Sequence, residues 1–343
     1  MRLDRYLAAQ LPELSRTRIQ QLIEAGLVLV GGRPTKGAHR LRGGEKIAVE
    51  AQARPPMQAV AEAIPLDILY EDADVIVVNK PAGMTVHAGA GNTRGTLVNA
   101  LLGRGQELSQ GGDALRPGIV HRLDKETSGV ILVAKNDFAH AKLAEGFRQR
   151  TVKKTYIALV EGLLTERQGR FELAIGRDLH RRTRMAVHRE KPGSALRRNA
   201  PRGGLLPGNA REARTDWRTL AEVDGTTLVE VQLHTGRTHQ IRVHFSAAKH
   251  PVVGDTLYGA SSQICVGAGV GRGAAREREQ VIIPPLERNF LHAARLGFSQ
   301  PRSGEWIEVR APMPRELHEF VKKLADAAGE DPKRIDAALA PYL

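Results

Sequence analysis

The chain of 343 residues has room for a catalytic domain with a sizeable core and a small additional module. It carries 51 Lys and Arg against 38 Asp and Glu, a net charge of +13 that favours a polyanionic partner such as nucleic acid. The single cysteine, Cys265, excludes an intramolecular disulfide framework and a multi-cysteine metal site, and no apolar run approaches the ~20 residues of a membrane span. We therefore expect a cytoplasmic protein without membrane contact.

Residues 1–50 have the pattern of a small independent unit. Apolar spacing predicts two short helices, the second beginning near Ser15, and then two strands connected through a Gly-Gly turn. Arg16 and Arg18 lie at the start of the second predicted helix, where the helix dipole and free N–H groups also favour phosphate. Two arginines alone would more often mark a solvated helix face.

The order of motifs in this unit is more informative than its charge. "SRTRIQQLIEAGLVLVGGRPTK", followed by "LRGGEKIAV", resembles the S4 RNA-binding domain, a small α/β fold. The resemblance implies that the unit binds structured RNA through Arg16, Arg18 and nearby basic residues. Residues 51–65 contain a Pro-Pro pair and little periodicity, which predicts a linker.

From Leu66 onward the pattern predicts a larger domain over residues 66–330, followed by a C-terminal tail at 331–343. Strands outnumber helices and do not alternate strictly with them, which predicts an α+β fold with a mainly antiparallel mixed sheet. The predicted strands are 68–70, 75–78, 130–133, 156–160, 228–233 and 306–310, and the predicted helices are 96–103, 137–150, 238–248 and 314–328.

Two segments of this domain have the composition of insertions. Residues 177–214 hold eleven Lys and Arg against three Asp and Glu, which favours contact with RNA over a merely solvated loop. Residues 259–280 are rich in Gly, Ala and Ser, which predicts a flexible loop.

The segment Pro117–Lys135 places the polar cluster "HRLDKETSG" between two apolar strand-like runs. Charged residues at the junction of buried strands need partners, because an unpaired buried charge costs several kcal/mol. Asp124 could be a structural ion-pair or turn residue. The basic residues on both sides of it, and the Thr-Ser-Gly that follows, make it equally a candidate site carboxylate.

A second polar segment is "LHTGRTHQIRVHF" at residues 233–245. Its spacing places Arg237 and Gln240 on one face of a predicted helix, and His239 and Arg242 on another. Such donors suit a phosphate, a uracil edge or a buried carboxylate, although an ordinary surface helix would also carry them. Tyr156, in "KKTYIA", could simply be a half-buried strand aromatic.

These motifs, taken in order, point to a family. "HRLDKETSG", "KKTYIALVEG", "LHTGRTHQIRVHF" and "HPVVGDTLYG" resemble the RluA family of pseudouridine synthases, and "PLDILYEDADVIVVNKPAGMTVHAGAGN" resembles their opening strand pair. The resemblance covers residues 66–328. The S4-like unit narrows it to members of the RluC and RluD type, and "MAVH" at 185–188 makes the RluD type the closer likeness.

The resemblance implies a role for each matching residue. Asp124 would be the catalytic aspartate, Tyr156 the aromatic that packs against the target base, and Arg242 the arginine that pairs with the aspartate. Arg122 would help to displace the target nucleotide. Further substrate contacts are expected from His121, Arg237, His239 and Gln240.

Isomerising uridine fits this set of residues. The nucleotide must leave the stack, which costs a few kcal/mol, and the base must detach from C1′, rotate and rejoin through C5 inside a closed pocket. Asp124 would act ionised, either attacking C1′ or removing a ribose proton, and Arg242 would hold its pKa down. We expect no cofactor and no metal, since no phosphate-loop or metal-ligand pattern is present.

The resemblance also implies a substrate, structured RNA. Large-subunit (23S) rRNA is expected, with tRNA as the alternative, and members of this type are expected to act as monomers. A non-catalytic RNA-binding factor for ribosome assembly would need only the S4-like unit and the basic surface. A glycosylase or an RNA hydrolase would instead release free uracil or cut the chain.

Overall fold

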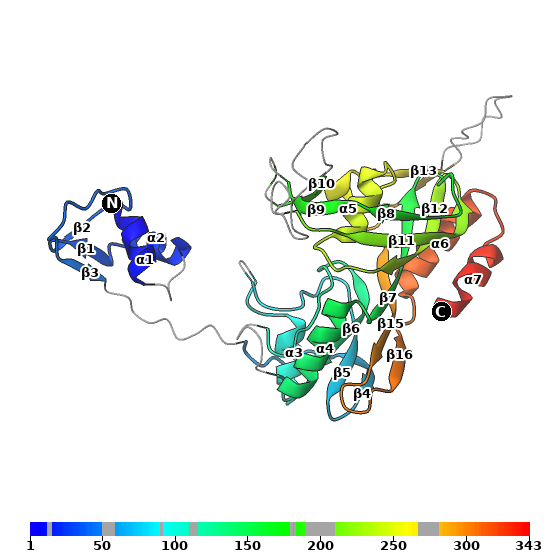
Figure 1. The fold of residues 1–343 in the computed structure, drawn as a ribbon. Coiled ribbons are helices and arrows are strands. Elements are labelled where there is room, and N and C mark those ends of the chain that lie inside the picture. The colour runs from blue at the N-terminus through cyan, green and yellow to red at the C-terminus, as the bar shows by residue number, and fades with distance from the viewer. Residues whose placement is uncertain are drawn as a thin grey trace, which may run out of the picture. The chain divides into compact units, whose positions relative to one another are not determined.

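The computed structural model describes residues 1–11, 16–49, 59–89, 92–109, 116–178, 181, 183–188, 210–266 and 281–343. The chain folds into two compact units, Met1–Met57 and Gln58–Leu343 (Figure 1). No helix in the described ranges combines the length and apolar character that crossing a bilayer requires.

The N-terminal unit packs two short helices on a small sheet. Helices α1 (Leu3–Gln10) and α2 (Arg16–Glu24) precede three antiparallel strands, which lie in the order β2 (Arg33–Pro34), β1 (Val28–Val30) and β3 (Ile47–Val49). Helical spacing buries apolar residues of both helices against β1. This core contains Leu3, Leu7, Ile19, Leu22, Ile23 and Val28. The side chains of Arg16 and Arg18 lie outside the described residues.

The larger unit is built on one extended sheet (Figure 1). Among the described residues its strands follow the order β4-β5-β6-β15-β7-β12-β11-β8, and β16 pairs with β15 as the ninth strand. Of its described pairings, β6–β15 is parallel and the others are antiparallel, which confirms the predicted mainly antiparallel mixed sheet. The strands are β4 (Asp67–Glu71), β5 (Val75–Lys80), β6 (Ser128–Ala134), β7 (Lys153–Glu161), β8 (Gln168–Glu172), β11 (Arg214–Val223), β12 (Thr226–Leu233), β15 (Leu291–Ser299) and β16 (Trp306–Arg310).

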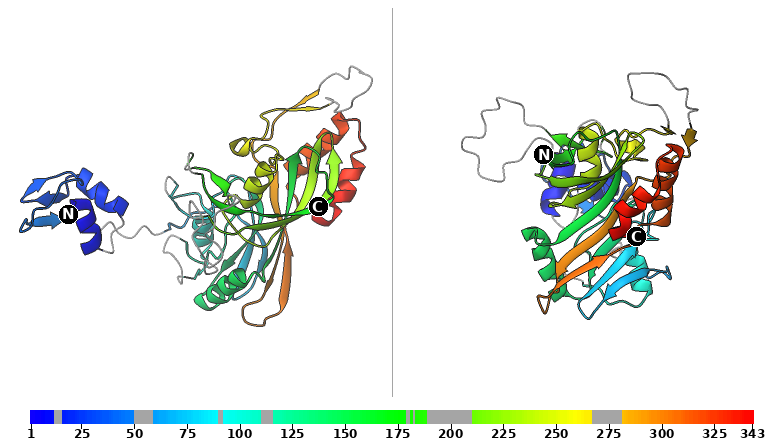
Figure 2. Two further views of the ribbon diagram at one scale, coloured as in Figure 1. Left: turned by 45° about the horizontal axis from the view of Figure 1, so that its top comes forward. Right: turned by 90° about the vertical axis from the view of Figure 1, so that its right-hand side faces the viewer.

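Helices cover both faces of this sheet. They are α3 (Leu97–Gly103), α4 (Asp137–Gln149), α5 (Gln240–Ala247), α6 (Arg315–Ala327) and α7 (Lys333–Leu339), with short 3-10 turns η3 (Thr256–Tyr258) and η4 (Ala340–Tyr342). Helix α4 lies on one side, and α6 and α7 lie on the other (Figure 2). Because side chains alternate along a strand, Val130 and Leu132 pack toward α4, whereas Ile131 and Val133 pack into the core beneath α3 and α6.

Strand β15 is the centre of the sheet. It pairs with β7 along its length on one side, and on the other with β6 at its start and with β16 at its end. Strands β4, β5 and β6 therefore lie on one side of β15, and β7, β12, β11 and β8 lie on the other. The sequence patterns had predicted neither β15 nor β11.

The end of the predicted linker belongs to the larger unit. Asn99 in α3 donates through Nδ2 to the carbonyl of Val60 at 2.6 Å, and the Glu62 N–H donates to the carbonyl of Asn99 at 2.9 Å. Asn99 and Thr96 also form a capping box at the start of α3. Residues 59–65 are thus fixed against α3, while 51–58 lie outside the described residues.

Parts of the two predicted insertions form strands. In 177–214, β10 (Met185–His188) pairs with β9 (Ala174–Arg177), and residues 189–209 lie outside the described part of the chain. In 259–280, β13 (Ile264–Val266) pairs with β14 (Val281–Ile283), and 267–280 are likewise outside it.

The predicted C-terminal tail is an integral part of the core. Residues 331–343 form α7 and η4, in which Ile335, Leu339 and Tyr342 are buried. The Tyr342 hydroxyl donates a hydrogen bond to the buried carboxylate of Glu230 in β12. The two prolines of this segment, Pro332 and Pro341, lie at the starts of the helical turns, where proline is tolerated.

Candidate active site

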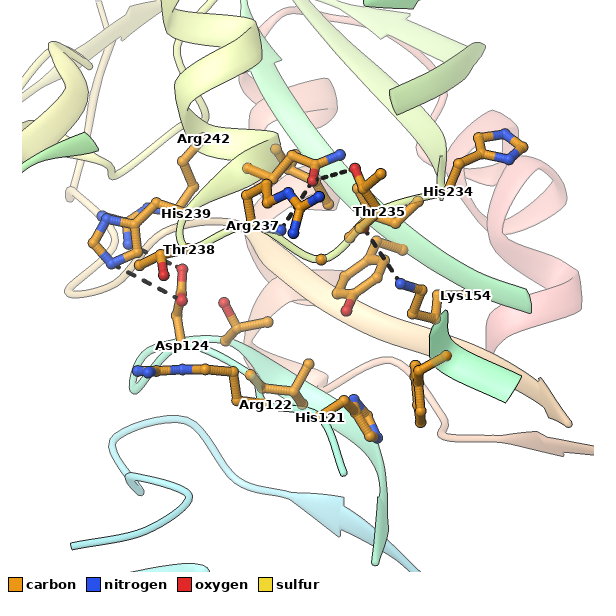
Figure 3. A pocket seen from close by; sticks show the side chains of 18 of the residues that line it. His121, Arg122, Asp124, Lys154, His234, Thr235, Arg237, Thr238, His239 and Arg242 are labelled. Atoms are coloured by element: carbon orange, nitrogen blue, oxygen red, sulfur yellow. Dashed lines mark hydrogen bonds and ion pairs between the residues drawn. The ribbon is translucent and has the colours of Figure 1, made fainter. Parts of the chain in front are cut away.

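A pocket of about 330 Å³ opens over the middle of the large sheet (Figure 3). It is lined by residues 120–124 ahead of β6, by Lys154 and Tyr156 of β7, by Leu291 of β15, and by residues 233–242, which run from the end of β12 into α5. The three polar segments singled out in the sequence therefore meet at one place, although more than a hundred residues separate the first from the last.

The segment that carries Asp124 is held by a buried lysine. Lys80, at the end of β5, is 0% exposed, and its Nζ donates to the carbonyls of Pro81 (2.7 Å), Met84 (2.9 Å) and Lys125 (3.1 Å). These three acceptors use the three donors of an ammonium group. Burial lowers the Lys80 pKa to about 7, although the Glu126 and Asp124 charges oppose that shift.

A glycine lets the same segment enter the sheet. Gly129 has a φ of +113°, and a Cβ placed there would lie 2.2 Å from the carbonyl oxygen of Ala293 in β15. The start of β6 can therefore lie directly against β15 only because residue 129 lacks a side chain. Nearby, Arg288 Nη1 donates to the carbonyl of Glu126 at 2.9 Å.

Arg242 joins two carboxylates. Its Nη1 donates to Asp124 Oδ2 at 3.1 Å, while Nε and Nη2 donate to Asp255 Oδ2 and Oδ1 at 2.6 and 2.9 Å. The Asp255 side chain is 2% exposed, Arg242 is 9% exposed and Asp124 is 16% exposed. Burial lowers the Arg242 pKa, but the hydrogen bond and charge of Asp255, with the charge of Asp124, outweigh it and raise that pKa overall. The guanidinium is therefore a permanent cation beside Asp124.

The segment after α5 completes this arrangement. Gly254, at a φ of +79°, packs so closely on residue 288 that a Cβ would lie 2.2 Å from the Arg288 carbonyl oxygen, which fixes the next residue, Asp255. The Arg242 guanidinium also lies over the Tyr258 ring, 4.9 Å from its centroid. The Tyr258 hydroxyl is 2.7 Å from His239 Nδ1.

His239 stands at the start of α5 in a left-handed conformation, with a φ of +55°. Its Nε2 lies 3.9 Å from Asp124 Oδ1, which is an ion-pair distance but too long for a hydrogen bond. Burial lowers the His239 pKa, and the Asp124 charge only partly offsets this effect. A positive φ in a histidine marks local strain of the kind found at functional sites.

Tyr156 is buried in the pocket wall, 6% exposed, two residues beyond Lys154 on the same face of β7. Burial, followed by the nearby Asp124 charge, raises the Tyr156 pKa above its ordinary value. The phenol is therefore neutral at physiological pH. It offers an aromatic face and a hydroxyl group, rather than a tyrosinate base.

Two residues expected to contact substrate have their polar groups engaged within the protein. Gln240 Oε1 accepts from Thr235 Oγ1 and from the Arg237 N–H, and Nε2 donates to the Arg214 carbonyl and Thr215 Oγ1. Gln240 therefore holds the 235–237 loop in place. His121 Nε2 accepts from the Leu132 N–H at 2.9 Å, and burial, then the Lys154 charge, lowers the His121 pKa to about 3, so its ring is neutral.

The pocket rim is cationic. Arg122 is exposed at the pocket edge, and Arg237 and Lys154 line it from the other side (Figure 3). Lys154 Nζ donates to the Thr235 carbonyl at 3.3 Å. A carboxylate fixed on a buried arginine, beside an aromatic ring and within a basic rim, suits a single nucleotide that has left its stack.

The comparisons agree with this geometry. Residues 74–247 match the family model described as RNA pseudouridylate synthase, and residues 1–47 match the S4 domain. The chain belongs to the RNA pseudouridylate synthase family. As a member it is an isomerase that acts on RNA, and its N-terminal unit is an S4 domain.

Several relatives of this pseudouridine synthase span nearly its whole length. A Bacillus subtilis RNA pseudouridine synthase is 38% identical over 323 residues, covering 94% of each chain. The ribosomal large subunit pseudouridine synthase D of Neisseria meningitidis is 40% identical over 331 residues, covering 96% of this chain and 80% of that one. The solved structure of human RNA pseudouridylate synthase domain containing 1 superposes with a TM-score of 0.52 at 27% identity, covering 79% of this chain and 98% of the other.

The structure gathers most of the predicted site residues of this synthase into one pocket. Asp124, Tyr156 and Arg242 line it, as do the expected substrate contacts His121, Arg122, Arg237, His239 and Gln240. Sequence reasoning assigned no role to Asp255, Tyr258, Lys80 or Lys154. All four fall inside the family motifs given above, which were the available signals: Lys80 in the opening strand pair, Lys154 in "KKTYIALVEG", and Asp255 and Tyr258 in "HPVVGDTLYG".

Proposed function

We propose that this enzyme converts specific uridines of large-subunit rRNA to pseudouridine, and that Asp124 is its essential carboxylate. The rRNA assignment is supported by the 40% identity to a relative described as ribosomal large subunit pseudouridine synthase D. The S4 domain and the net charge of +13 are consistent with a large structured RNA as partner.

The observation that carries the role of Asp124 is its ion pair with Arg242 inside the pocket. The 3.1 Å contact holds Oδ2, while Oδ1 has no hydrogen bond to a described residue and is available to the ribose. A carboxylate held in this way by a permanent cation is fixed in its orientation. Asp124 is thus suited to act at the sugar, either on C1′ or on the C2′ proton.

The neighbouring residues suit the rest of the reaction. Arg122 at the exposed rim can take the place of the extruded nucleotide in the RNA stack, and the neutral ring of Tyr156 can pack against the uracil. After the C1′–N1 bond breaks, the base must turn so that C5 faces C1′, and a proton must leave C5 when the new bond forms. Tyr156 and Leu291, which line the pocket, offer the apolar surface against which the detached base can rotate.

The test is pseudouridine mapping of total rRNA and tRNA, by chemical derivatisation and primer extension, from cells that carry wild-type protein or Asp124→Asn. Asp67→Asn is a matched control, because Asp67 is an exposed carboxylate on β4 that hydrogen-bonds Asn79. Expression and folding of each variant are checked by immunoblot and by circular dichroism of the purified protein.

We expect discrete large-subunit rRNA sites to lose pseudouridine in Asp124→Asn and to keep it in Asp67→Asn. Loss confined to tRNA would replace rRNA with tRNA as the substrate. Unchanged maps in a strain without a redundant synthase would refute the role of Asp124. Free uracil released from the RNA would indicate a glycosylase.

A further inference from the structure

The cations of the pocket fall into two groups. Arg242 is paired with Asp255 and Asp124, and Arg148 is paired with Glu145. Lys154 and Arg237 have no carboxylate hydrogen-bonded or ion-paired to them among the described residues; their recorded acceptors are backbone carbonyls. Lys154 donates to Thr235, and Arg237 Nε donates to the Glu212 carbonyl at 3.0 Å.

These two cations are also close enough to repel each other. The Lys154 pKa is lowered to about 8, first by burial and then by the Arg237 charge. Burial likewise lowers the Arg237 pKa, and the charges of Arg211 and Arg150 lower it further against a smaller opposing effect of Glu212. Burial and like charge thus both disfavour the charged forms of Lys154 and Arg237, and an anion bound between them would offset this cost.

The position of the two cations limits what that anion can be. Lys154 lies across the pocket from Asp124, and Arg237 lies above the space between them (Figure 3). A neighbouring hollow lined by Arg177, Arg211 and Arg237 continues from the pocket along the surface. Uracil is neutral until its C1′–N1 bond breaks, whereas RNA carries a negative phosphate on each side of every nucleotide from the moment it binds.

We infer that Lys154 and Arg237 form a phosphate seat, which binds a backbone phosphate next to the target uridine while Asp124 acts on its ribose. Two fixed points, the phosphate in this seat and the ribose at Asp124, would set the orientation of the flipped nucleotide. The inference rests on RNA as the substrate of this enzyme. It does not depend on whether that RNA is rRNA or tRNA.

The direct test removes the Lys154 charge and keeps its aliphatic stem, as Lys154→Met. Lys153→Met is the matched control, because Lys153 is exposed on the opposite face of β7, with its Nζ 5.3 Å from the Trp306 ring centroid and outside the pocket. Binding to an in vitro large-subunit rRNA transcript is measured by filter binding between 50 and 300 mM salt, with folding checked by circular dichroism. Lys154→Arg tests whether a cation alone restores binding.

We expect Lys154→Met to weaken RNA binding about ten-fold and to reduce the slope of log K against log salt by about one. Lys154→Arg should recover most of the lost affinity. If Lys154→Met slows pseudouridine formation with unchanged affinity and salt slope, the lysine acts on the uracil and the phosphate seat is refuted. Unchanged affinity, slope and rate would refute it equally.

A second experiment locates the phosphate. Synthetic hairpins are built around the uridine found by mapping, in whichever RNA it lies, with one neutral methylphosphonate at each flanking linkage in turn. At one linkage, the neutral substitution should weaken RNA binding by the wild-type protein about ten-fold. The same substitution should weaken RNA binding by Lys154→Met almost no further. If the effects of the neutral linkage and of Lys154→Met on RNA affinity multiply at every linkage, Lys154 does not contact a flanking phosphate. The result is independent of the role of Asp124, because only binding is measured.

Discussion

Asp255 holds the Arg242 guanidinium through two hydrogen bonds, at 2.6 and 2.9 Å, and leaves Nη1 directed at Asp124. The pocket carboxylate Asp124 is therefore positioned by a second carboxylate that does not line the pocket. Because Asp255 is 2% exposed, this positioning is rigid and cannot be replaced by solvent.

We predict that Asp255→Asn slows pseudouridine formation by roughly ten- to a hundred-fold, since one of the two bonds that orient Arg242 is lost. Single-turnover rates at saturating enzyme measure the effect. RNA affinity should change little, because Asp255 does not itself line the pocket. Asp336→Asn, which alters an exposed carboxylate paired with His318 and Lys322, should leave the rate unchanged. A rate in Asp255→Asn equal to wild type would contradict the positioning role.

Lys80 predicts a pH dependence of stability. Its pKa is about 7 in the folded protein, below the ordinary 10.5 of an unfolded lysine, so the unfolded chain binds more protons between these values. The contribution of Lys80 to the free energy of unfolding therefore rises from pH 7 toward pH 10, by at most about 1.4 kcal/mol per pH unit. Urea unfolding of wild type and Lys80→Met at pH 7, 8 and 9 should show that part of the rise is absent from the variant. Lys153→Met should retain the wild-type dependence.

The close contact between Gly129 and β15 predicts that adding a side chain at residue 129 disrupts the packing of the two strands. Gly129→Ala would place a methyl group 2.2 Å from the Ala293 carbonyl oxygen and force a residue with a side chain to a φ of +113°. We expect a loss of more than about 3 kcal/mol in the free energy of unfolding, because β6 and β15 must separate. Gly225→Ala has a positive φ of +72° but open space around its Cβ, and should cost only about 1 kcal/mol. Equal losses in thermal and urea unfolding of the two variants would contradict this interpretation.

The raised pKa of Tyr156 predicts that its hydroxyl group does not ionise during the reaction. Burial and the Asp124 charge raise the Tyr156 pKa, so the phenol stays protonated across the range in which the enzyme can be assayed. The pH–rate profiles of wild type and Tyr156→Phe from pH 6 to 9.5 should therefore have the same shape, whatever the ratio of their rates. A basic limb that is present in wild type and missing from Tyr156→Phe would show that the hydroxyl ionises during the reaction.

The sequence predicted those elements whose pattern is local. The apolar runs of β5 and β6 and the regular spacing of α4 and α6 identified them without tertiary information. Strand β15 was missed because "LHAARLGFS" is buried on both faces and interrupted by Arg295, so it lacks alternation. The segment 331–343 was predicted to be a tail because Pro332 and Pro341 limit the helical pattern of Ile335, Leu339 and Tyr342 to a few residues.

The site residues likewise divide into those that stand in local motifs and those whose roles depend on tertiary contacts. Asp124, Tyr156 and Arg242 stand in motifs that can be recognised along the chain. Asp255 and Lys80 act by holding other groups, through contacts that become visible only once β5, the Asp124 segment and the segment after α5 are brought together. The roles of the motif residues stay predictions until the variants are assayed.

The place of β15 has a consequence for how the enzyme is made. Asp124 lies just ahead of β6, on one side of β15. Tyr156 lies on β7 and Arg242 on α5, which follows β12, and both of these strands lie on the other side of β15, which is encoded at residues 291–299. A chain emerging from the ribosome can assemble each half, but it cannot bring the carboxylate and its arginine together until the strand between them has been synthesised. The pairing of Asp124 with Arg242 is thus tied to synthesis of the chain through β15, and truncated products that end between Arg242 and β15 would keep the S4 domain without the assembled pocket.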